Sequence, residues 1–224
     1  MSQKLKKIIY TRPEMFDFNK KVLLKRGVSI ESIAEITYQQ QSRYSDNVSR
    51  QVCVESVEKI LSLRDVFHHV QLACEIDRMA EQGLFQGPIQ DIIYEDLGLF
   101  GIDETMGLDV AGLYGTIGQT NFGDIDVNKH GIVKRLNDAG KEDGICHTFL
   151  DDIVGAIAAA ASTRVAQVLN EEIARDVRKH SDERIRTQDA LGSASESIVT
   201  LFSKIKVFTK AYLCLGYKTK SYTI

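Results

Sequence analysis

The chain has 224 residues, of which 43% are hydrophobic and 26% are charged, and its formal net charge is −3. This composition is typical of a globular protein and excludes a disordered or fibrous chain. Nucleic-acid-binding domains are usually basic, so the slight negative charge argues against a nucleic-acid partner.

Proline and cysteine usage narrows the fold class. Pro13 and Pro88 are the two prolines, and long stretches without turn residues favour an all-helical chain over a many-stranded sandwich. The four cysteines lie apart without C-x-x-C spacing, which is typical of reduced, buried thiols in a cytoplasmic protein. We therefore expect an all-α cytoplasmic protein without a zinc site or a disulfide framework.

The hydrophobic stretches are short. A helix that crosses a bilayer needs roughly 18–20 apolar residues, whereas the longest uncharged run, 153–163, lies between Asp152 and Arg164. The apolar stretch at 8–10 is too short for a signal peptide. We expect a protein that is soluble or that lies at most on the inner membrane surface.

Capping patterns and hydrophobic spacing together predict four helices in the first half. The stretch from Thr11 to Glu14 forms a capping box with an early proline, and Ser29 is the expected cap of a second helix. Hydrophobic residues at helical spacing predict further helices over about 49–61 and 65–82. The inner side of the first helix is expected to carry Phe16, Val22, Leu23 and Leu24.

The second half is expected to hold a short helix ending near Glu95, a helix over about 103–114, and then a loop over 115–126. The stretch "GIVKRLNDAGK" predicts another short helix. The longest helix is expected to begin near Thr148 and to run past Glu172.

The tail differs in character, so we divide the chain into a helical domain, 1–180, and a C-terminal extension, 181–224. Within 198–215 one helical face carries Ile198, Leu201, Phe202, Ile205, Phe208, Tyr212 and Leu215. Lysines beside this face would allow peripheral contact with an anionic membrane. The face can equally pack on its own domain or on a second subunit of a homo-oligomer, and we favour packing because most amphipathic helices bury their apolar face in protein.

The stretch "HTFLDDIVGAIAAAASTR", 147–164, supports two interpretations. In the first, Thr148 and Asp151 form a capping box and have no chemical role. The residues that follow are small on every face, which predicts the central helix of a multi-helix orthogonal bundle. Asp151 and Asp152 would then lie near the core, where unpaired carboxylates are costly, and this favours the second interpretation, a metal site.

A second acidic pair, Asp103 and Glu104, opens the predicted helix over 103–114. Carboxylate oxygens are the ligands preferred by hard cations such as Mg²⁺. The sequence therefore suggests a divalent-cation site in which the two acidic pairs meet.

A glycine-rich stretch, "YGTIGQTNFG", is the third candidate element. Gly115, Thr116, Gly118 and Asn121 offer backbone N–H groups and side-chain donors of the kind that hold an oxyanion. A glycine turn between two helices is the alternative, and it is favoured when this stretch is taken by itself. His147 can be a general acid, a ligand or a helix-entry residue.

The stretches "GLFGIDETMGLDVAGLYGTIGQTNFGDID" and "HTFLDDIVGAIAAAASTRVA" resemble the phosphatidylglycerophosphatase A family, in its short, soluble, helical bacterial branch. A looser resemblance extends over about 18–166 and does not include the tail. The resemblance implies Mg²⁺-dependent hydrolysis of phosphatidylglycerophosphate to phosphatidylglycerol in phospholipid biosynthesis. One family signature falls on Gly115, Thr116 and Gly118, and the other falls on Leu150, Asp151, Asp152 and Gly155.

These observations give one main hypothesis, a Mg²⁺-dependent phosphomonoesterase for a lipid or lipid-like glycerophosphate. The metal ligands would be Asp103, Glu104, Asp151 and Asp152. The catalytic candidates are Asp152, which would accept a proton from the attacking water, together with Asp151 and His147. The phosphate would be bound by Gly115, Thr116, Gly118 and Asn121.

Two alternatives remain at this point. The first is a non-enzymatic helical protein that binds a metal or ligand, or that serves as an oligomeric interaction module. The second is a soluble phosphatase for nucleotide or sugar phosphates.

Overall fold

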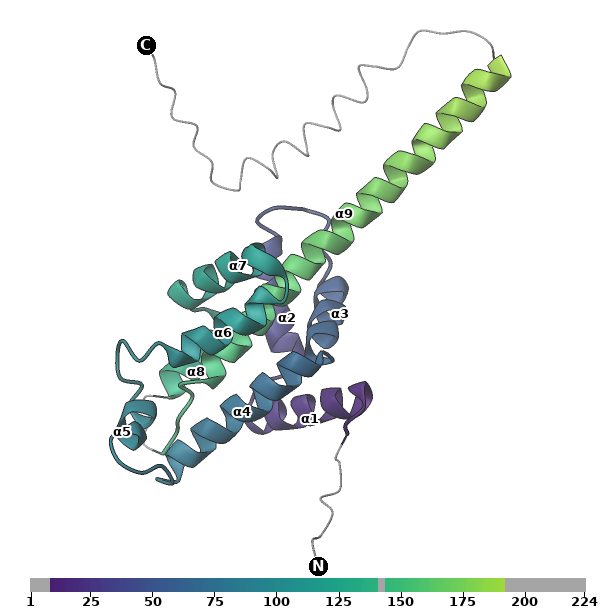
Figure 1. The fold of residues 1–224 in the computed structure, drawn as a ribbon. Coiled ribbons are helices and arrows are strands. Elements are labelled where there is room, and N and C mark those ends of the chain that lie inside the picture. The colour runs from purple at the N-terminus through teal and green to yellow at the C-terminus, as the bar shows by residue number, and fades with distance from the viewer. Residues whose placement is uncertain (1–8, 141–143, 192–224) are drawn as a thin grey trace, which may run out of the picture. The chain divides into compact units, whose positions relative to one another are not determined.

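The computed structural model describes residues 9–140 and 144–191, with side chains up to 181. These residues form nine α-helices and no strands, which confirms the all-α prediction (Figure 1). In chain order they are α1 (Arg12–Lys25), α2 (Ile30–Gln41), α3 (Arg50–Leu61), α4 (Arg64–Glu81), α5 (Ile89–Tyr94), α6 (Ile102–Gly112), α7 (Gly115–Val127), α8 (Gly131–Ala139) and α9 (Leu150–Leu191).

The chain divides into two compact units, Met1–Asn170 and Glu171–Ile224, and the boundary falls within α9. The first unit contains the hydrophobic core and the candidate site. The division at residue 180 inferred from composition remains a prediction, and the apolar seam predicted over 198–215 lies outside the described residues.

The first helices begin where their capping residues predict. The Thr11 side chain accepts from the backbone N–H of Glu14, whose carboxylate accepts from the N–H of Thr11, and Ser29 forms a similar box. The prediction that Leu24 faces inward is wrong, because its side chain is 62% exposed. The buried face of α1 follows a four-residue spacing, Met15, Asn19 and Leu23, and Leu24 lies about 100° away from it.

Helix α9 is the central helix, as predicted. Every residue from 150 to 163 is buried, and most of these side chains are small, so neighbouring helices approach closely. A Cβ atom at Gly155 would lie 3.4 Å from Ile125 Cγ2 of α7. Three cysteines, Cys53, Cys74 and Cys146, are buried free thiols, as expected.

The prediction of a loop over 115–126 is wrong, because this segment forms the helix α7. Its buried residues, Gly118, Phe122 and Ile125, recur at helical spacing and form an inward face. A Cβ at Gly118 would lie 2.1 Å from the carbonyl oxygen of Ala111, so this glycine allows α7 to pack directly against α6. Gly118 therefore serves close packing, which sequence patterns do not separate from turn formation.

One segment in the described part of the chain, Leu150–Ser181, is long and apolar enough to cross a membrane by length and composition. The expectation that no segment approaches the length needed to cross a bilayer is therefore wrong by length and composition. The mean hydropathy over a window of this segment stays high although charged residues flank its apolar run. In this structure 72% of the window is buried inside the molecule, as in the core helix of a soluble protein.

Candidate metal centre

Three carboxylates from two helices meet at one point. Asp103 and Glu104 lie in the first turn of α6, Asp152 lies in the first turn of α9, and one oxygen from each falls within 4.8 Å of the others. Asp103 and Asp152 are each only 4% exposed. This cluster can hold a metal ion, as the two acidic pairs suggested, since oxygen ligands at this separation suit a hard divalent cation.

The electrostatics of the cluster favour a bound cation. Burial and the neighbouring carboxylates raise the pKa of Asp103 and that of Asp152. A hydrogen bond with Asp103 lowers the pKa of Glu104. Among the described residues, Asp103 Oδ1 is buried without a hydrogen-bond partner. An orphaned buried carboxylate oxygen is costly in protein alone and is what a metal ligand requires, so the residues fit the ion.

Lys129, in the short link between α7 and α8, brings a positive charge to the cluster. Its Nζ donates to Asp151 Oδ2 at 2.7 Å, pairs with Asp126 Oδ1 at 3.1 Å and lies 3.8 Å from Asp152 Oδ1. Burial acts to lower the pKa of Lys129, but Asp151 and the other carboxylates outweigh it and raise this pKa. Sequence reasoning missed Lys129 and Asp126, although a lysine that follows an acidic helix end was a signal.

Asp151 is turned toward Lys129 and is not one of the three clustered carboxylates. Its Oδ1 accepts from the backbone N–H of Asp152 at 3.0 Å, and its Oδ2 binds the lysine. Burial raises the pKa of Asp151 to about 6, against the effect of Lys129. Its assignment as a metal ligand remains a prediction, and the observed contacts are with the lysine.

The start of α9 is held by a residue from α4. Asp77 is fully buried, and its two carboxylate oxygens accept from the backbone N–H groups of Phe149 and Leu150, both at 3.0 Å. The Thr148 hydroxyl donates instead to the carbonyl oxygen of Ile93 at 2.6 Å. The predicted capping box is therefore wrong, because a buried carboxylate distant in sequence satisfies the helix N-terminus.

The His147 ring contacts the end of α8 rather than the acidic cluster. Its Nδ1 donates to the carbonyl oxygen of Leu136 at 3.0 Å, and burial lowers the pKa of the ring. The charges that act on it belong to Arg26 and Glu81. The structure thus does not bring His147 together with the carboxylates, and its catalytic role stays a prediction.

The residues predicted to bind phosphate lie in the first half of α7 and, for Asn121, at its middle. Gly115 and Thr116 begin this helix, whereas Asp126 near its end contacts Lys129, about 16 Å away along the axis. Asn121 donates to the hydroxyl of Thr163, which lies about 16 Å along α9 from Asp152. The structure does not bring these residues, or Gly118, to the carboxylates.

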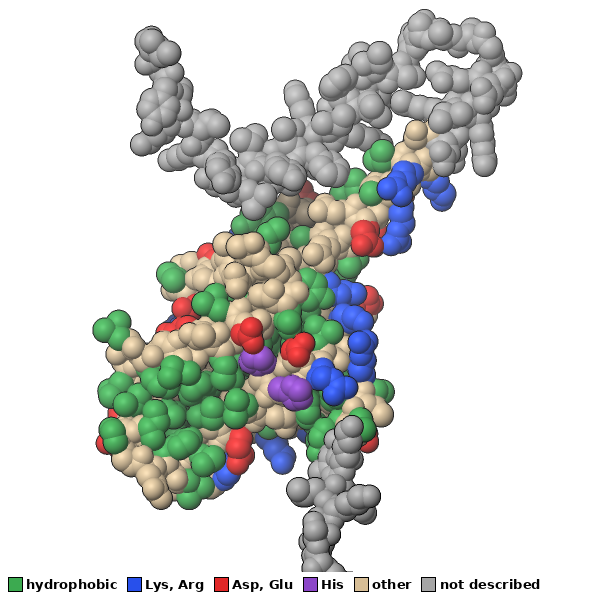
Figure 2. Space-filling model, viewed as in Figure 1, with side chains coloured by type: hydrophobic (Ala, Val, Ile, Leu, Met, Phe, Trp, Pro, Cys, Tyr) green, Lys and Arg blue, Asp and Glu red, His purple; other side chains and the backbone are tan. Residues whose placement is uncertain are grey.

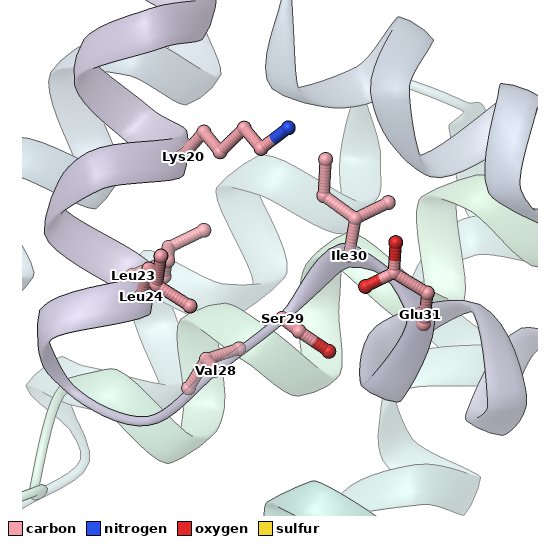
Figure 3. Close-up of a pocket in the computed structure, with 7 residues that line it drawn as sticks. All are labelled: Lys20, Leu23, Leu24, Val28, Ser29, Ile30 and Glu31. Carbon is pink, nitrogen blue, oxygen red and sulfur yellow. The ribbon is translucent and has the colours of Figure 1, made fainter.

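A small pocket lies between the end of α1 and the start of α2, with Lys20 and Glu31 beside apolar side chains (Figure 3). Its volume of about 80 Å³ is far below what a drug-sized ligand occupies. None of the clustered carboxylates lines it. It is therefore not the candidate site.

Comparison with known proteins decides the family. Residues 47–167, more than half of the chain, match the family model described as phosphatidylglycerophosphatase A. The chain belongs to this family. The matched segment includes both acidic pairs and Lys129, and the resemblance inferred from the sequence is confirmed.

Two relatives come from Bacillus subtilis. The uncharacterized protein YpjQ is 45% identical over 175 residues, which are 78% of this chain and 96% of YpjQ. The uncharacterized protein YutG is 44% identical over 142 residues, which are 63% of this chain and 84% of YutG.

Solved structures of similar chains share the fold. The crystal structure of YpjQ has a TM-score of 0.68 at 44% identity, and the match covers 72% of this chain and 99% of that one. The low temperature requirement C protein of Listeria monocytogenes has a TM-score of 0.67 at 41% identity, with coverages of 70% and 97%. Membership of the phosphatidylglycerophosphatase A family indicates a phosphatase-like role for this protein.

Proposed function

We propose that this protein is a Mg²⁺-dependent phosphomonoesterase that hydrolyses phosphatidylglycerophosphate, or a related lipid glycerophosphate, to phosphatidylglycerol and phosphate. The observation that carries the proposal is the cluster of Asp103, Glu104 and Asp152, with a buried and unpartnered oxygen, in a member of this phosphatase family.

The clustered carboxylates would hold the metal, with Asp151 beside them. A bound divalent cation polarises a phosphoryl group and lowers the pKa of water. Asp152 is the candidate proton acceptor, because burial raises the pKa of its carboxyl above the ordinary value, so that its carboxylate form, which a bound cation would maintain, is a stronger base than an ordinary aspartate. Asp77 keeps Asp152 in position by anchoring the first turn of α9.

An apolar surface beside the cluster supports a lipid substrate. Leu97, Leu99 and Ile102 are 48%, 105% and 55% exposed, and Ile102 directly precedes Asp103. Figure 2 shows hydrophobic side chains gathered over α5 and the adjoining parts of α4 and α6. Exposed apolar groups next to a phosphate-handling site suit the acyl chains of a phospholipid.

The cellular setting is part of the same proposal. We place the protein in the cytoplasm and propose, as the alternative to the packing favoured above, peripheral contact of 198–215 with the inner membrane surface. The same segment can instead mediate self-association into a homo-oligomer. Sedimentation with anionic vesicles, before and after deletion of the segment, would distinguish membrane contact from self-association.

The deciding experiment measures phosphate release from phosphatidylglycerophosphate in mixed micelles, with Mg²⁺ and with a chelator, alongside water-soluble phosphate esters. We expect metal-dependent release from the lipid, reduced more than about 100-fold in Asp152→Asn by loss of a metal ligand. Asp124→Asn, an exposed carboxylate paired with Arg43, is the matched control.

Two results would contradict the proposal. Full activity of both Asp152→Asn and Asp103→Asn would remove the assigned site. A large rise in melting temperature with Mg²⁺, without turnover of any ester, would support the non-enzymatic alternative, since a ligand that binds only the folded state stabilises it.

A further inference from the structure

Lys129 is a cation placed among carboxylates at the candidate metal centre, and the phosphatase chemistry described above does not use it. It lies in the link after α7, and its side chain is 26% exposed, compared with 8% for Asp151 and 5% for Asp152. The Lys129 side chain is therefore more accessible to solvent than the two aspartates of α9 that it approaches.

The contacts of the ammonium leave part of its bonding capacity uncommitted. A lysine ammonium has three N–H donors. Two close contacts, to Asp151 at 2.7 Å and to Asp126 at 3.1 Å, hold it in place, while Asp152 Oδ1 at 3.8 Å is too distant for a hydrogen bond. One donor thus remains beside the carboxylate that belongs to the metal cluster.

The net charge of the site indicates what the uncommitted N–H donor of Lys129 can bind. The contacts of Lys129 and the acidic cluster share Asp152, and together they bring one ammonium and five carboxylates into the same region: Asp103, Glu104, Asp126, Asp151 and Asp152. When all of them are ionised, one divalent cation leaves the site negative, and a phosphate dianion then needs every available positive group. Gly115, the first glycine of the stretch that the sequence offered for phosphate binding, lies about 16 Å from Asp126 along α7.

We propose that Lys129 is a substrate-binding residue that contacts the phosphoryl oxygens of a phosphate monoester and is positioned by Asp126 and Asp151. This inference rests on the proposed function of the same site. In the competing role Lys129 is only a counter-ion for the carboxylates, and phosphate does not touch it.

Calorimetric titration separates the two roles. Inorganic phosphate is titrated into the full chain, saturated with Mg²⁺, as wild type, Lys129→Met, Lys129→Arg and Lys134→Met. Lys134 is the matched control, because it lies on the adjacent helix α8, is exposed and pairs with Asp138 at 2.7 Å. We expect Lys129→Met to weaken phosphate binding about tenfold or more, Lys129→Arg to restore most of it, and the control to match wild type.

Titration with Mg²⁺ alone completes the test. Since Lys129→Met removes a positive charge next to the ligands, it should bind Mg²⁺ at least as tightly as wild type. A parallel loss of Mg²⁺ affinity would assign Lys129 to building the metal site and overturn the proposal. So would unchanged phosphate affinity in Lys129→Met, or the absence of phosphate binding by the Mg²⁺-saturated wild type.

A measurement on the wild type covers the case in which Lys129→Met does not fold. The ¹⁵N signal of the Lys129 ammonium, identified by its loss in Lys129→Arg, should shift on addition of phosphate, and an unmoved signal would overturn the proposal. Phosphate binding through Lys129 without ester hydrolysis would contradict the proposed function alone. Hydrolysis with unchanged phosphate binding by Lys129→Met would contradict this inference alone.

Discussion

The first turn of α9 and its middle turns both bury polar side chains, but in different ways. In the middle, neutral groups pair: Gln41 donates to Ser162 at 2.8 Å, and Asn121 donates to Thr163 at 3.1 Å. In the first turn, Asp152 joins other carboxylates, and burial raises its pKa. The middle turns thus gain stability from matched hydrogen bonds, while the first turn holds a carboxyl group whose ionisation is unfavourable without a cation, as expected where a site binds one.

The largest loss of stability is expected where the middle region depends on close helix packing. Gly118→Ala would place a Cβ 2.1 Å from the Ala111 carbonyl oxygen and displace α7, which carries Asn121 to Thr163. We expect a loss of about 3 kcal/mol in the free energy of unfolding, measured by urea denaturation. Gly123→Ala, with no atom within 4 Å, is the control and should be neutral or slightly stabilising. Equal stability of the two variants would show that Gly118 has no packing role.

The next effect concerns the anchor of the first turn. Asp77→Ala leaves the buried N–H groups of Phe149 and Leu150 without their acceptor, which should cost roughly 2–3 kcal/mol in unfolding free energy and weaken Mg²⁺ binding. Chemical denaturation and calorimetry measure the two effects. Glu75→Ala, an exposed residue on the same helix, should change stability by less than about 0.5 kcal/mol. Unaltered Mg²⁺ affinity in a destabilised Asp77→Ala would limit this residue to a structural role.

A smaller loss is expected in the middle turns. Ser162→Ala removes the acceptor of the buried Gln41 amide, which should cost about 1–2 kcal/mol. The cost should be the same at pH 5 and pH 9, because neither group titrates between them, and phosphate release per folded molecule should not change. A pH-dependent cost would link this pair to the charged first turn.

The fourth prediction concerns a substitution, Asp152→Asn, that should raise the stability of the metal-free protein at alkaline pH. Burial raises the pKa of Asp152 to about 9, so the folded protein retains a proton that the unfolded chain has lost, and stability falls as pH rises between about 4 and 9. In chelator, Asp152→Asn should weaken this fall and exceed wild-type stability at pH 8 by of the order of 1 kcal/mol. Melting curves from pH 5 to pH 9 measure the effect, with Asp124→Asn as the control. A wild-type curve that is flat over this range would contradict it.

Local patterns in the sequence predicted much of the fold. The capping residues Thr11 and Ser29 mark helix starts because the bonds that they make span only three residues. The small residues after Asp152 predicted a buried central helix, since close packing on all sides requires them. The glycines of α7 were misassigned to a loop, because a glycine that avoids a clash and a glycine that permits a turn have the same sequence signal.

The sequence by itself determined the helical class, the family and the acidic residue types of the candidate site. The tertiary structure alone decided which carboxylates meet, because Asp103 and Asp152 lie far apart in the chain and adopt their separation only when α6 packs near the start of α9. It also decided that Asp77 anchors α9 and that Lys129 lies beside Asp151. These contacts join helices that are distant in sequence, and no local propensity encodes such pairings.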